Sequence, residues 1–132
     1  MSAPSLKPGQ PCFCGSGHPY GQCCQPWHLG QPAPSAEALM RSRYVAYCLG
    51  LQDYLLATWH PGSRPAELDL HTPPQPKWLD LEIRRHLPGA DSAQVEFIAR
   101  YRLGGRAMRL HETSRFRKED GRWYYVDGDY SE

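Results

Sequence analysis

The sequence predicts an α+β fold, in which helices pack on one face of a bent antiparallel sheet and a small cysteine-rich segment precedes them. Helical periodicity dominates the middle of the chain, whereas a period of two dominates the last third. Helices followed by a run of strands are typical of α+β proteins. The length of 132 residues suits one ordinary domain with a small appendage, and a charged fraction of 22% is globular rather than disordered.

Composition divides the chain into four parts. Residues 1–10 are predicted to form a flexible tail, and residues 11–28 form a compact knuckle rich in cysteine and glycine. Residues 29–34 contain one glycine and two prolines and are predicted to be a linker. The main domain then occupies residues 35–132.

The first helix is predicted over residues 35–49. Ser35 is a good N-cap, Glu37 lies in the first turn, where its charge suits the helix dipole, and Gly50 can end the helix. The apolar residues of this segment recur at helical spacing and form one stripe. That stripe consists of Ala36, Met40, Tyr44, Tyr47, Cys48 and Leu51.

A second, shorter helix is predicted over residues 52–59, where Pro61 closes it. Five prolines between residues 60 and 76 then predict an irregular connection. The segment 77–83 fits either a strand or a short helix.

The last third predicts an antiparallel meander. Apolar and polar residues alternate over 93–103 and 108–116, and a third short strand is predicted over 123–126. Glycine-containing turns separate the three segments.

Four cysteines near the beginning predict a metal site. Cys12 and Cys14 form a C-x-C pair, and Cys23 and Cys24 follow as an adjacent pair. Tetrahedral Zn²⁺ takes four such ligands, and the glycines after Cys14 let the backbone turn sharply. The adjacent pair must lie in a turn or at a helix start to reach the same ion. Metal binding, worth about 10–16 kcal/mol in peptide-sized sites, would hold together a segment too small for a hydrophobic core.

Other interpretations of the cysteines remain open at this point. His18 or His28 could replace Cys24 as the fourth ligand, because imidazole is an equally good zinc ligand. The thiols could also be unliganded or form a redox-active dithiol, although a C-x-x-C motif is absent. Four cysteines would leave no coordination position for water, so the predicted site is structural rather than catalytic.

The run PCFCGSGHPYGQCC resembles the SEC-C motif, a zinc-binding tail best known from the motor of the preprotein translocase. Cys12, Cys14, Cys23 and Cys24 fall on its four ligand positions, and Cys24 stands where the translocase tail has a histidine. In the translocase the motif is implicated in contacts with an export chaperone and the ribosome. The resemblance implies, by analogy, a protein or ribosomal partner for this chain.

The later segments AEALMRSRYVAYCLGLQDYLLATWHPGSRP, LHETSRF and WYYVDGD resemble the YchJ-like family of uncharacterised bacterial proteins. This resemblance implies a domain similar to nuclear transport factor 2, in which helices pack into a strongly curved antiparallel sheet and form a cone. It supplies no function by itself.

Cones of this kind often hold a pocket at the mouth, and the sequence offers candidates for its lining. Glu112 falls on a core-facing strand position, where burying an unpartnered carboxylate is costly, and Arg43 or His60 could be its partner. Alternatively, Glu112 braces the sheet through a hydrogen bond. The pocket candidates are Arg43, Trp59, His60, Tyr101, Glu112 and Asp127. Such a pocket would serve a small-molecule binder or an enzyme.

Basic side chains alternate on the opposite strand face and could form a strip for RNA or the ribosome. A solvated outer sheet face is the alternative, given a net charge of +1. The residues are Arg100, Arg102, Arg109, His111, Arg115 and Arg117.

The leading hypothesis is a zinc-binding adaptor whose knuckle presents His18, Tyr20 and their neighbours to a partner. No apolar stretch is long enough for a signal peptide or a membrane span, so we expect a cytoplasmic protein. In that compartment clustered cysteines serve as metal ligands more often than as disulfides.

Overall fold

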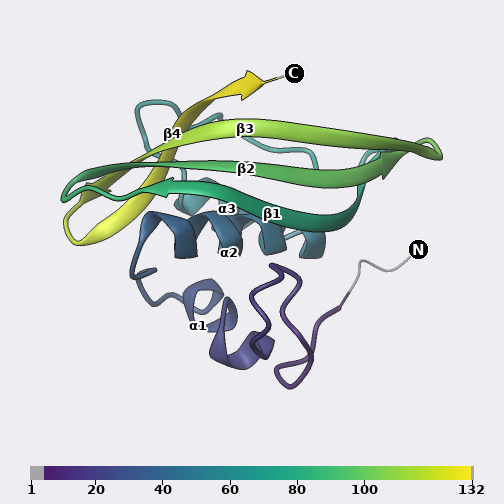
Figure 1. Cartoon of the computed structure of the whole chain (residues 1–132), viewed down its shortest axis with the longest axis horizontal. Coiled ribbons are helices and arrows are strands. Elements are labelled where there is room, and N and C mark those ends of the chain that lie inside the picture. The colour runs from purple at the N-terminus through teal and green to yellow at the C-terminus, as the bar shows by residue number, and fades with distance from the viewer. Residues whose placement is uncertain (1–4, 132) are drawn as a thin grey trace.

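The computed structural model describes residues 5–131, and its centre is a four-stranded antiparallel sheet (Figure 1). The strands follow one another in space as they do in sequence, in the order β1-β2-β3-β4. Their bounds are β1 Lys77–Leu87, β2 Ser92–Leu103, β3 Arg106–Glu119 and β4 Arg122–Ser131. The helices are α1 Gln25–His28, α2 Ala36–Leu49 and α3 Gln52–Ala57, with a short 3-10 helix, η1, at Tyr20–Gln22.

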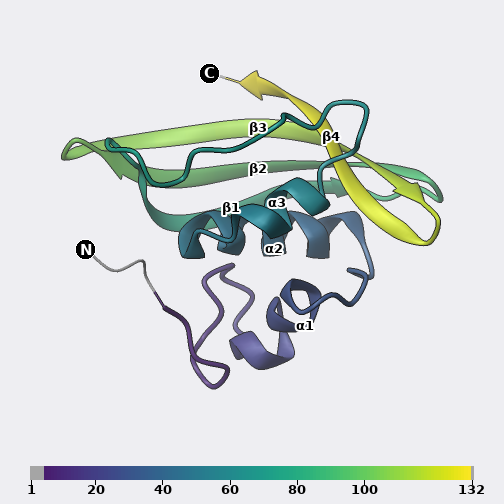
Figure 2. The same ribbon diagram turned by 180° about the vertical axis from the view of Figure 1, so that it is seen from behind.

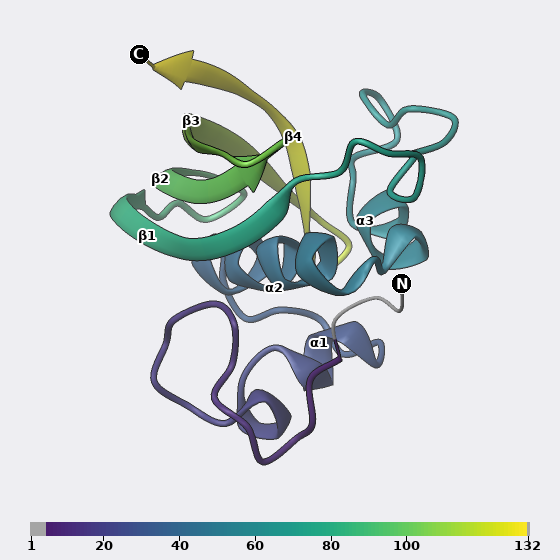
Figure 3. The ribbon, with the colours of Figure 1, turned by 90° about the vertical axis from the view of Figure 1, so that its right-hand side faces the viewer.

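The molecule is layered, and helix α2 is its middle layer. Figure 3 shows the sheet curving over one side of α2 and the cysteine-containing segment lying against the other side. Figure 2 shows α3 beside α2, and the irregular connection from α3 to β1 running along the length of the sheet. The predicted α+β class, with helices on a curved sheet, is therefore confirmed.

Helix α2 begins and ends where the sequence predicts. The Ser35 side chain accepts a hydrogen bond from the Ala38 N–H at 3.1 Å, which satisfies one free donor of the first turn, and Gly50 is the C-cap. The burial differs from the predicted single stripe. Every residue from Leu39 to Ala46 except Arg41 is buried, because layers cover α2 on both sides.

The sheet confirms the three predicted strands and resolves the ambiguous segment. Residues 77–87 form an edge strand paired with β2, rather than a short helix. The register shifts twice along this pairing and once between β3 and β4, at Arg115/Phe116. Such irregularities bend strands, which lets the sheet wrap around α2. Within residues 5–131, we find no helix with both the length and the apolar character needed to cross a bilayer.

The core lies between α2 and the concave face of the sheet. The inward positions of β2 are buried from Ala93 to Ala99, as their alternation predicts, whereas Tyr101 and Leu103 are half-buried. The core is continuous with the knuckle, because Cys12, Cys14, Tyr20 and Cys24 belong to the same cluster of buried residues as Leu39. The knuckle and the main domain, which the sequence predicts as two units joined by a linker, therefore share one hydrophobic core.

Candidate metal centre

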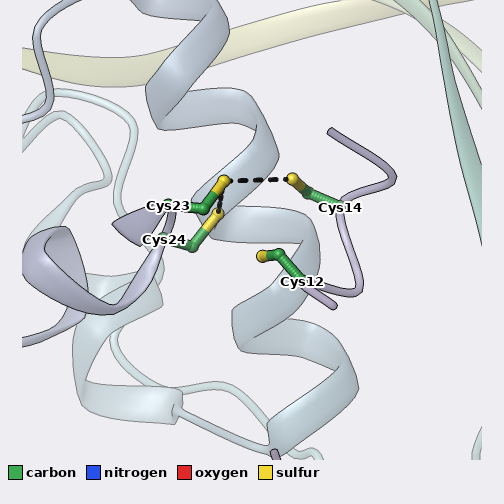
Figure 4. A group of neighbouring side chains, drawn as sticks. All are labelled: Cys12, Cys14, Cys23 and Cys24. Atoms are coloured by element: carbon green, nitrogen blue, oxygen red, sulfur yellow. Dashed lines mark hydrogen bonds between the residues drawn. The ribbon is translucent and has the colours of Figure 1, made fainter. Parts of the chain in front are cut away.

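The four predicted cysteine ligands converge on one point (Figure 4). Their sulfur atoms all lie within 4.8 Å of one another, with 3.5 Å between those of Cys14 and Cys23 and 3.9 Å between those of Cys23 and Cys24. Four sulfurs bound tetrahedrally to zinc at about 2.3 Å lie roughly 3.8 Å apart. The donor set therefore fits a thiophilic ion of that size, and the described cysteines form no disulfide.

A tight loop brings Cys12 and Cys14 to the same side of the site. The Cys12 N–H donates to the His18 carbonyl at 2.9 Å, and the Gly15 N–H donates to the Cys12 carbonyl at 3.2 Å. Gly15 and the following Gly17 adopt positive φ angles of 79° and 87°, which residues with a side chain rarely adopt. The glycines therefore allow the chain to turn directly after the second ligand.

The second pair of cysteines lies at a helix start, as the sequence predicts. Cys23 caps the C-terminus of η1, where its N–H donates to the Tyr20 carbonyl at 3.0 Å. Cys24 is the N-cap of α1, which has a proline in its first turn. Two adjacent residues can aim at one ion only because the backbone changes direction between these two short helices.

His28 and His18, the alternative fourth ligands, are engaged elsewhere or exposed. The Tyr20 hydroxyl donates to His28 Nδ1 at 2.6 Å, and His28 Nε2 donates to the Ser42 carbonyl at 2.8 Å. Both ring nitrogens are thus occupied, and burial lowers the pKa of His28, which favours its neutral form. His18 is exposed and lies outside the cluster, so Cys24 completes the donor set.

The thiols of the cluster interact strongly with one another. Hydrogen bonds from the thiols of Cys12 and Cys24 hold the pKa of Cys14 well below its usual range. Contacts with the thiols of Cys12 and Cys14 raise the pKa of Cys24, and the contact with the Cys14 thiol raises the pKa of Cys12 to about 12. The arrangement stabilises a thiolate at the centre of the cluster, which is the form that binds a metal.

Two further side chains support the ligands. Arg41 of α2 donates from Nη1 to the Cys14 carbonyl at 2.8 Å, and this places a positive charge beside a site that becomes negative when thiolates bind a divalent ion. The Ser16 hydroxyl lies 3.2 Å from the Cys23 sulfur. The sequence does not indicate this role of Arg41, because only the packing of the knuckle on α2 brings two residues that are 27 positions apart into contact.

The knuckle is docked firmly against the main domain. Tyr20 is buried and His28 bonds to α2, so both side chains are packing contacts. The expectation that the knuckle presents Tyr20 to a partner is therefore wrong. The predicted flexible tail also differs from the structure near its end, since the carbonyls of Pro8 and Gln10 accept hydrogen bonds from Gly21 and Tyr20. Residues 1–4 of that tail lie outside the described residues.

The structure brings together three of the predicted pocket residues. Arg43, Trp59 and Glu112 line one cavity of about 260 Å³ between α2 and the sheet. The Glu112 carboxylate accepts hydrogen bonds from the hydroxyls of Ser114 and Tyr125. It therefore braces the sheet through hydrogen bonds, which is the alternative that the sequence offered to pairing with Arg43 or His60. The β3–β4 register, which sequence periodicity does not specify, pairs Tyr125 with Phe116, and from there the Tyr125 hydroxyl reaches Glu112 at 3.1 Å.

The other three pocket candidates lie elsewhere. His60 Nε2 is 2.7 Å from a Glu119 carboxylate oxygen, and Asp127 accepts a hydrogen bond from Arg115 at 2.6 Å. The Tyr101 ring packs against Trp78, with 5.1 Å between the ring centroids.

The basic residues on the outer sheet face have acidic neighbours. Arg100 contacts both Asp80 and Glu82, and His111 lies 2.6 Å from a Glu96 oxygen. Arg115 contacts Asp127 and Asp129. Carboxylates therefore offset much of the positive charge on which a phosphate-binding strip would depend.

Comparisons with known proteins agree with the geometry. A family model described as YchJ, middle NTF2-like domain, matches residues 35–128, and the SEC-C motif model matches residues 10–26. A UPF0225 protein of Xanthomonas campestris pv. campestris is 53% identical over 122 residues, which cover 91% of this chain and 95% of that protein. A UPF0225 protein of Bordetella parapertussis is 52% identical over 133 residues, with 98% of each chain covered.

Two solved structures are similar along most of the chain. A solution structure of a SEC-C motif containing protein from Rhodopseudomonas palustris has a TM-score of 0.83 and 39% identity, and the match covers 93% of this chain and 100% of that one. A crystal structure of a SEC-C motif containing protein from Psychrobacter arcticus has a TM-score of 0.74 and 30% identity, and the match covers 92% and 82%.

Proposed function

The chain belongs to the YchJ-like UPF0225 family of bacterial proteins, and from this membership and the geometry of its cysteine cluster we propose that it is a cytoplasmic zinc-binding adaptor. Zn²⁺ would be held by Cys12, Cys14, Cys23 and Cys24 and would fix the shape of the knuckle. The knuckle would then present a fixed surface to a protein partner, either an export chaperone or a ribosomal protein by analogy with the SEC-C motif.

The observation that carries this proposal is a donor set of four thiols with an exposed aromatic residue between two of them. Four thiolates fill the coordination sphere of zinc and leave no position for a catalytic water, which favours a structural role. Phe13 lies between Cys12 and Cys14 and is 38% exposed, although aromatic side chains are usually buried. Exposed aromatic residues are enriched at binding sites.

The surroundings of Phe13 support a binding surface that spans the knuckle and the main domain. Phe13 stands at an open groove of about 760 Å³, which Tyr47, Leu68, Trp78 and Leu79 also line. Leu79 is 46% exposed. We name this region the Phe13 groove. A metal that holds the loop of Phe13 in place would also set the shape of one wall of this groove.

The first test is metal content. We expect about one zinc per chain in the purified protein, and substitution of Cys23 by serine should lower that content strongly, because three remaining thiols bind zinc less tightly than four. A zinc-free protein with an intact fold would contradict the proposal.

The second test is partner binding. Purified ribosomes and a purified export chaperone serve as probes in co-sedimentation and pull-down assays with the zinc-loaded protein. We expect Phe13→Ala to weaken binding to one of them by about tenfold, as central aromatic contacts do. Leu87→Ala removes an equally exposed apolar side chain from the far end of β1 and is the matched control. Two results would contradict the proposal. In one, the wild type binds neither probe; in the other, Phe13→Ala and Leu87→Ala bind with the same affinity.

A further inference from the structure

The cavity between α2 and the sheet contains a buried cation. Arg43 is 4% exposed, and its guanidinium carbon lies 5.1 Å from the ring centroid of Trp59 and 4.7 Å from that of Tyr125. Its Nη1 donates to the Leu55 carbonyl at 2.8 Å and to the Thr58 hydroxyl at 2.7 Å. These bonds use two of the five guanidinium donors. Among residues 5–131, the neighbour of the remaining donors, on Nε and Nη2, is the neutral hydroxyl of Tyr47, and no carboxylate forms an ion pair with them.

The same cavity contains a buried anion. Glu112 is 5% exposed, and one of its carboxylate oxygens, Oε2, accepts hydrogen bonds from Ser114 and from Tyr125. The other oxygen, Oε1, has no hydrogen-bond partner in the described part of the chain, and no basic side chain there lies within salt-bridge distance of Glu112. The carboxylate is therefore held by neutral hydroxyls only.

Strand β4 is shaped to accept this carboxylate. Gly128 lies opposite Ser114, and a Cβ atom added to Gly128 would collide with the Glu112 carboxylate. Any larger residue at position 128 would force Glu112 to move. The fold thus provides space for a charge at a place where burying that charge is unfavourable.

The two buried charges line one cavity without forming an ion pair with each other. Burying charges costs several kcal/mol each unless they are paired and fully hydrogen-bonded. Arg43 would repel a purely cationic ligand, and Glu112 would repel a purely anionic one. A neutral ligand would leave both charges without a counterion. A ligand that carries both charges satisfies both groups.

We propose that this cavity binds a small zwitterion of amino-acid size, with its carboxylate toward Arg43, its ammonium toward Glu112 and an apolar side chain against the aromatic walls. The volume of about 260 Å³ lies just below the usual range for drug-sized ligands, which suits a small metabolite rather than a nucleotide. Tyr44 and Trp78 supply apolar wall area beside the charged groups. This inference does not rest on the adaptor function, although the cavity shares Tyr44, Tyr47 and Trp78 with the Phe13 groove.

The test uses the full-length, zinc-loaded protein and three probes that differ in charge. L-phenylalanine carries both charges, 2-phenylethylamine only the ammonium, and 3-phenylpropionate only the carboxylate. Titration followed by ligand-observed NMR should show L-phenylalanine binding at millimolar concentration or below, and each singly charged probe binding about tenfold more weakly or worse. L-leucine is added as an aliphatic zwitterion.

Variants test the Glu112 end of the site. Glu112→Gln keeps the shape but removes the anion, so it should lose the preference for L-phenylalanine over 3-phenylpropionate. Gly128→Ala moves the carboxylate without changing the charge and should reduce the same preference. Glu96→Gln, on the outer face of β2 beside His111, is the matched control and should bind like the wild type.

Three outcomes would overturn the proposal. The first is no binding of either zwitterion at millimolar concentration. The second is a singly charged probe that binds as tightly as L-phenylalanine. The third is an unchanged preference in Glu112→Gln, provided that circular dichroism shows that this variant is folded.

Discussion

His28 joins the knuckle to the main domain through a hydrogen bond on each side of its ring. One nitrogen accepts from Tyr20 of the knuckle, and the other donates to the Ser42 carbonyl of α2. Neither bond involves the metal ligands. We therefore predict that His28→Ala leaves about one zinc per chain but lowers the free energy of unfolding by about 1–3 kcal/mol, because buried polar partners lose their hydrogen bonds.

The measurements are zinc analysis and urea unfolding of the two proteins. His18→Ala serves as the control, because His18 is exposed and its loss should change the free energy of unfolding by less than about 0.5 kcal/mol. Loss of zinc from His28→Ala, with His18→Ala unaffected, would show that His28 is a ligand after all.

Gly128 gives a second prediction for a single residue. Gly128→Ala should lower the free energy of unfolding by about 1–3 kcal/mol, because the added methyl group collides with Glu112 and overpacks the site. In a Glu112→Ala background the same change should cost much less, since the colliding group is gone. A double-mutant cycle by urea unfolding measures this coupling, and additive effects would disprove the steric explanation.

Single residues also show what the sequence could and could not predict. The clustering of the four cysteines was predictable, because thiols at such close spacing are often metal ligands. The role of His28 was not, since a histidine in a short segment can be a ligand, a surface residue or a packing residue. A hydrogen bond by which Glu112 braces the sheet was one of the predicted alternatives. Tyr125 as its partner was not predictable, because that contact depends on the pairing of β3 and β4 and on the path of the Tyr125 side chain.

We expect the short elements of the knuckle to depend on a bound metal for their order. Segments η1 and α1 have three and four residues, too few to be stable helices alone. We predict that a strong chelator will increase amide hydrogen exchange over residues 10–28 and, to a smaller extent, over 36–46, where α2 would lose one covering layer. Strands β2 and β3 pair along most of their length and should keep their protection.

Hydrogen exchange measured by mass spectrometry, with and without chelator, checks this prediction. Addition of zinc should restore the original protection. Unchanged exchange over residues 10–28 in a protein shown to be free of metal would mean that packing alone orders the knuckle.

The predictability of the elements follows the strength of their periodicity. Helix α2 and strands β2 and β3 were predicted because each has a long, regular alternation and clear caps or turns. Strand β1 was ambiguous because it is an edge strand with many charged residues and two register shifts, which disturb its period. The second covering layer of α2 was missed, since a stripe predicts only the face that is most apolar.

For the molecule as a whole, buried tyrosines set the alkaline limit of stability. Burial holds the pKa values of Tyr44 and Tyr125 above their usual range, whereas in the unfolded chain tyrosines ionise near pH 10. Above that pH the unfolded state releases protons that the folded state retains. The contribution of these groups to stability is therefore complete below about pH 10 and is lost as the pH rises further.

We predict that the free energy of unfolding falls above about pH 10. In Tyr44→Phe this fall should be less steep than in the wild type, with a difference in slope of about 1.4 kcal/mol per pH unit. Urea unfolding of both proteins from about pH 8 to 11 checks the difference. Identical slopes for the variant and the wild type would show that Tyr44 does not contribute.

The position of α2 as a shared middle layer has a consequence for tolerance to substitution. When every position of a helix with one solvent-facing side is substituted in turn, tolerant and intolerant positions alternate with a period near 3.6 residues. Between Leu39 and Ala46 only Arg41 is not buried, and it anchors the knuckle. Every position of that stretch should therefore be sensitive to substitution, as in a helix that is buried on all sides and unlike an amphipathic surface helix.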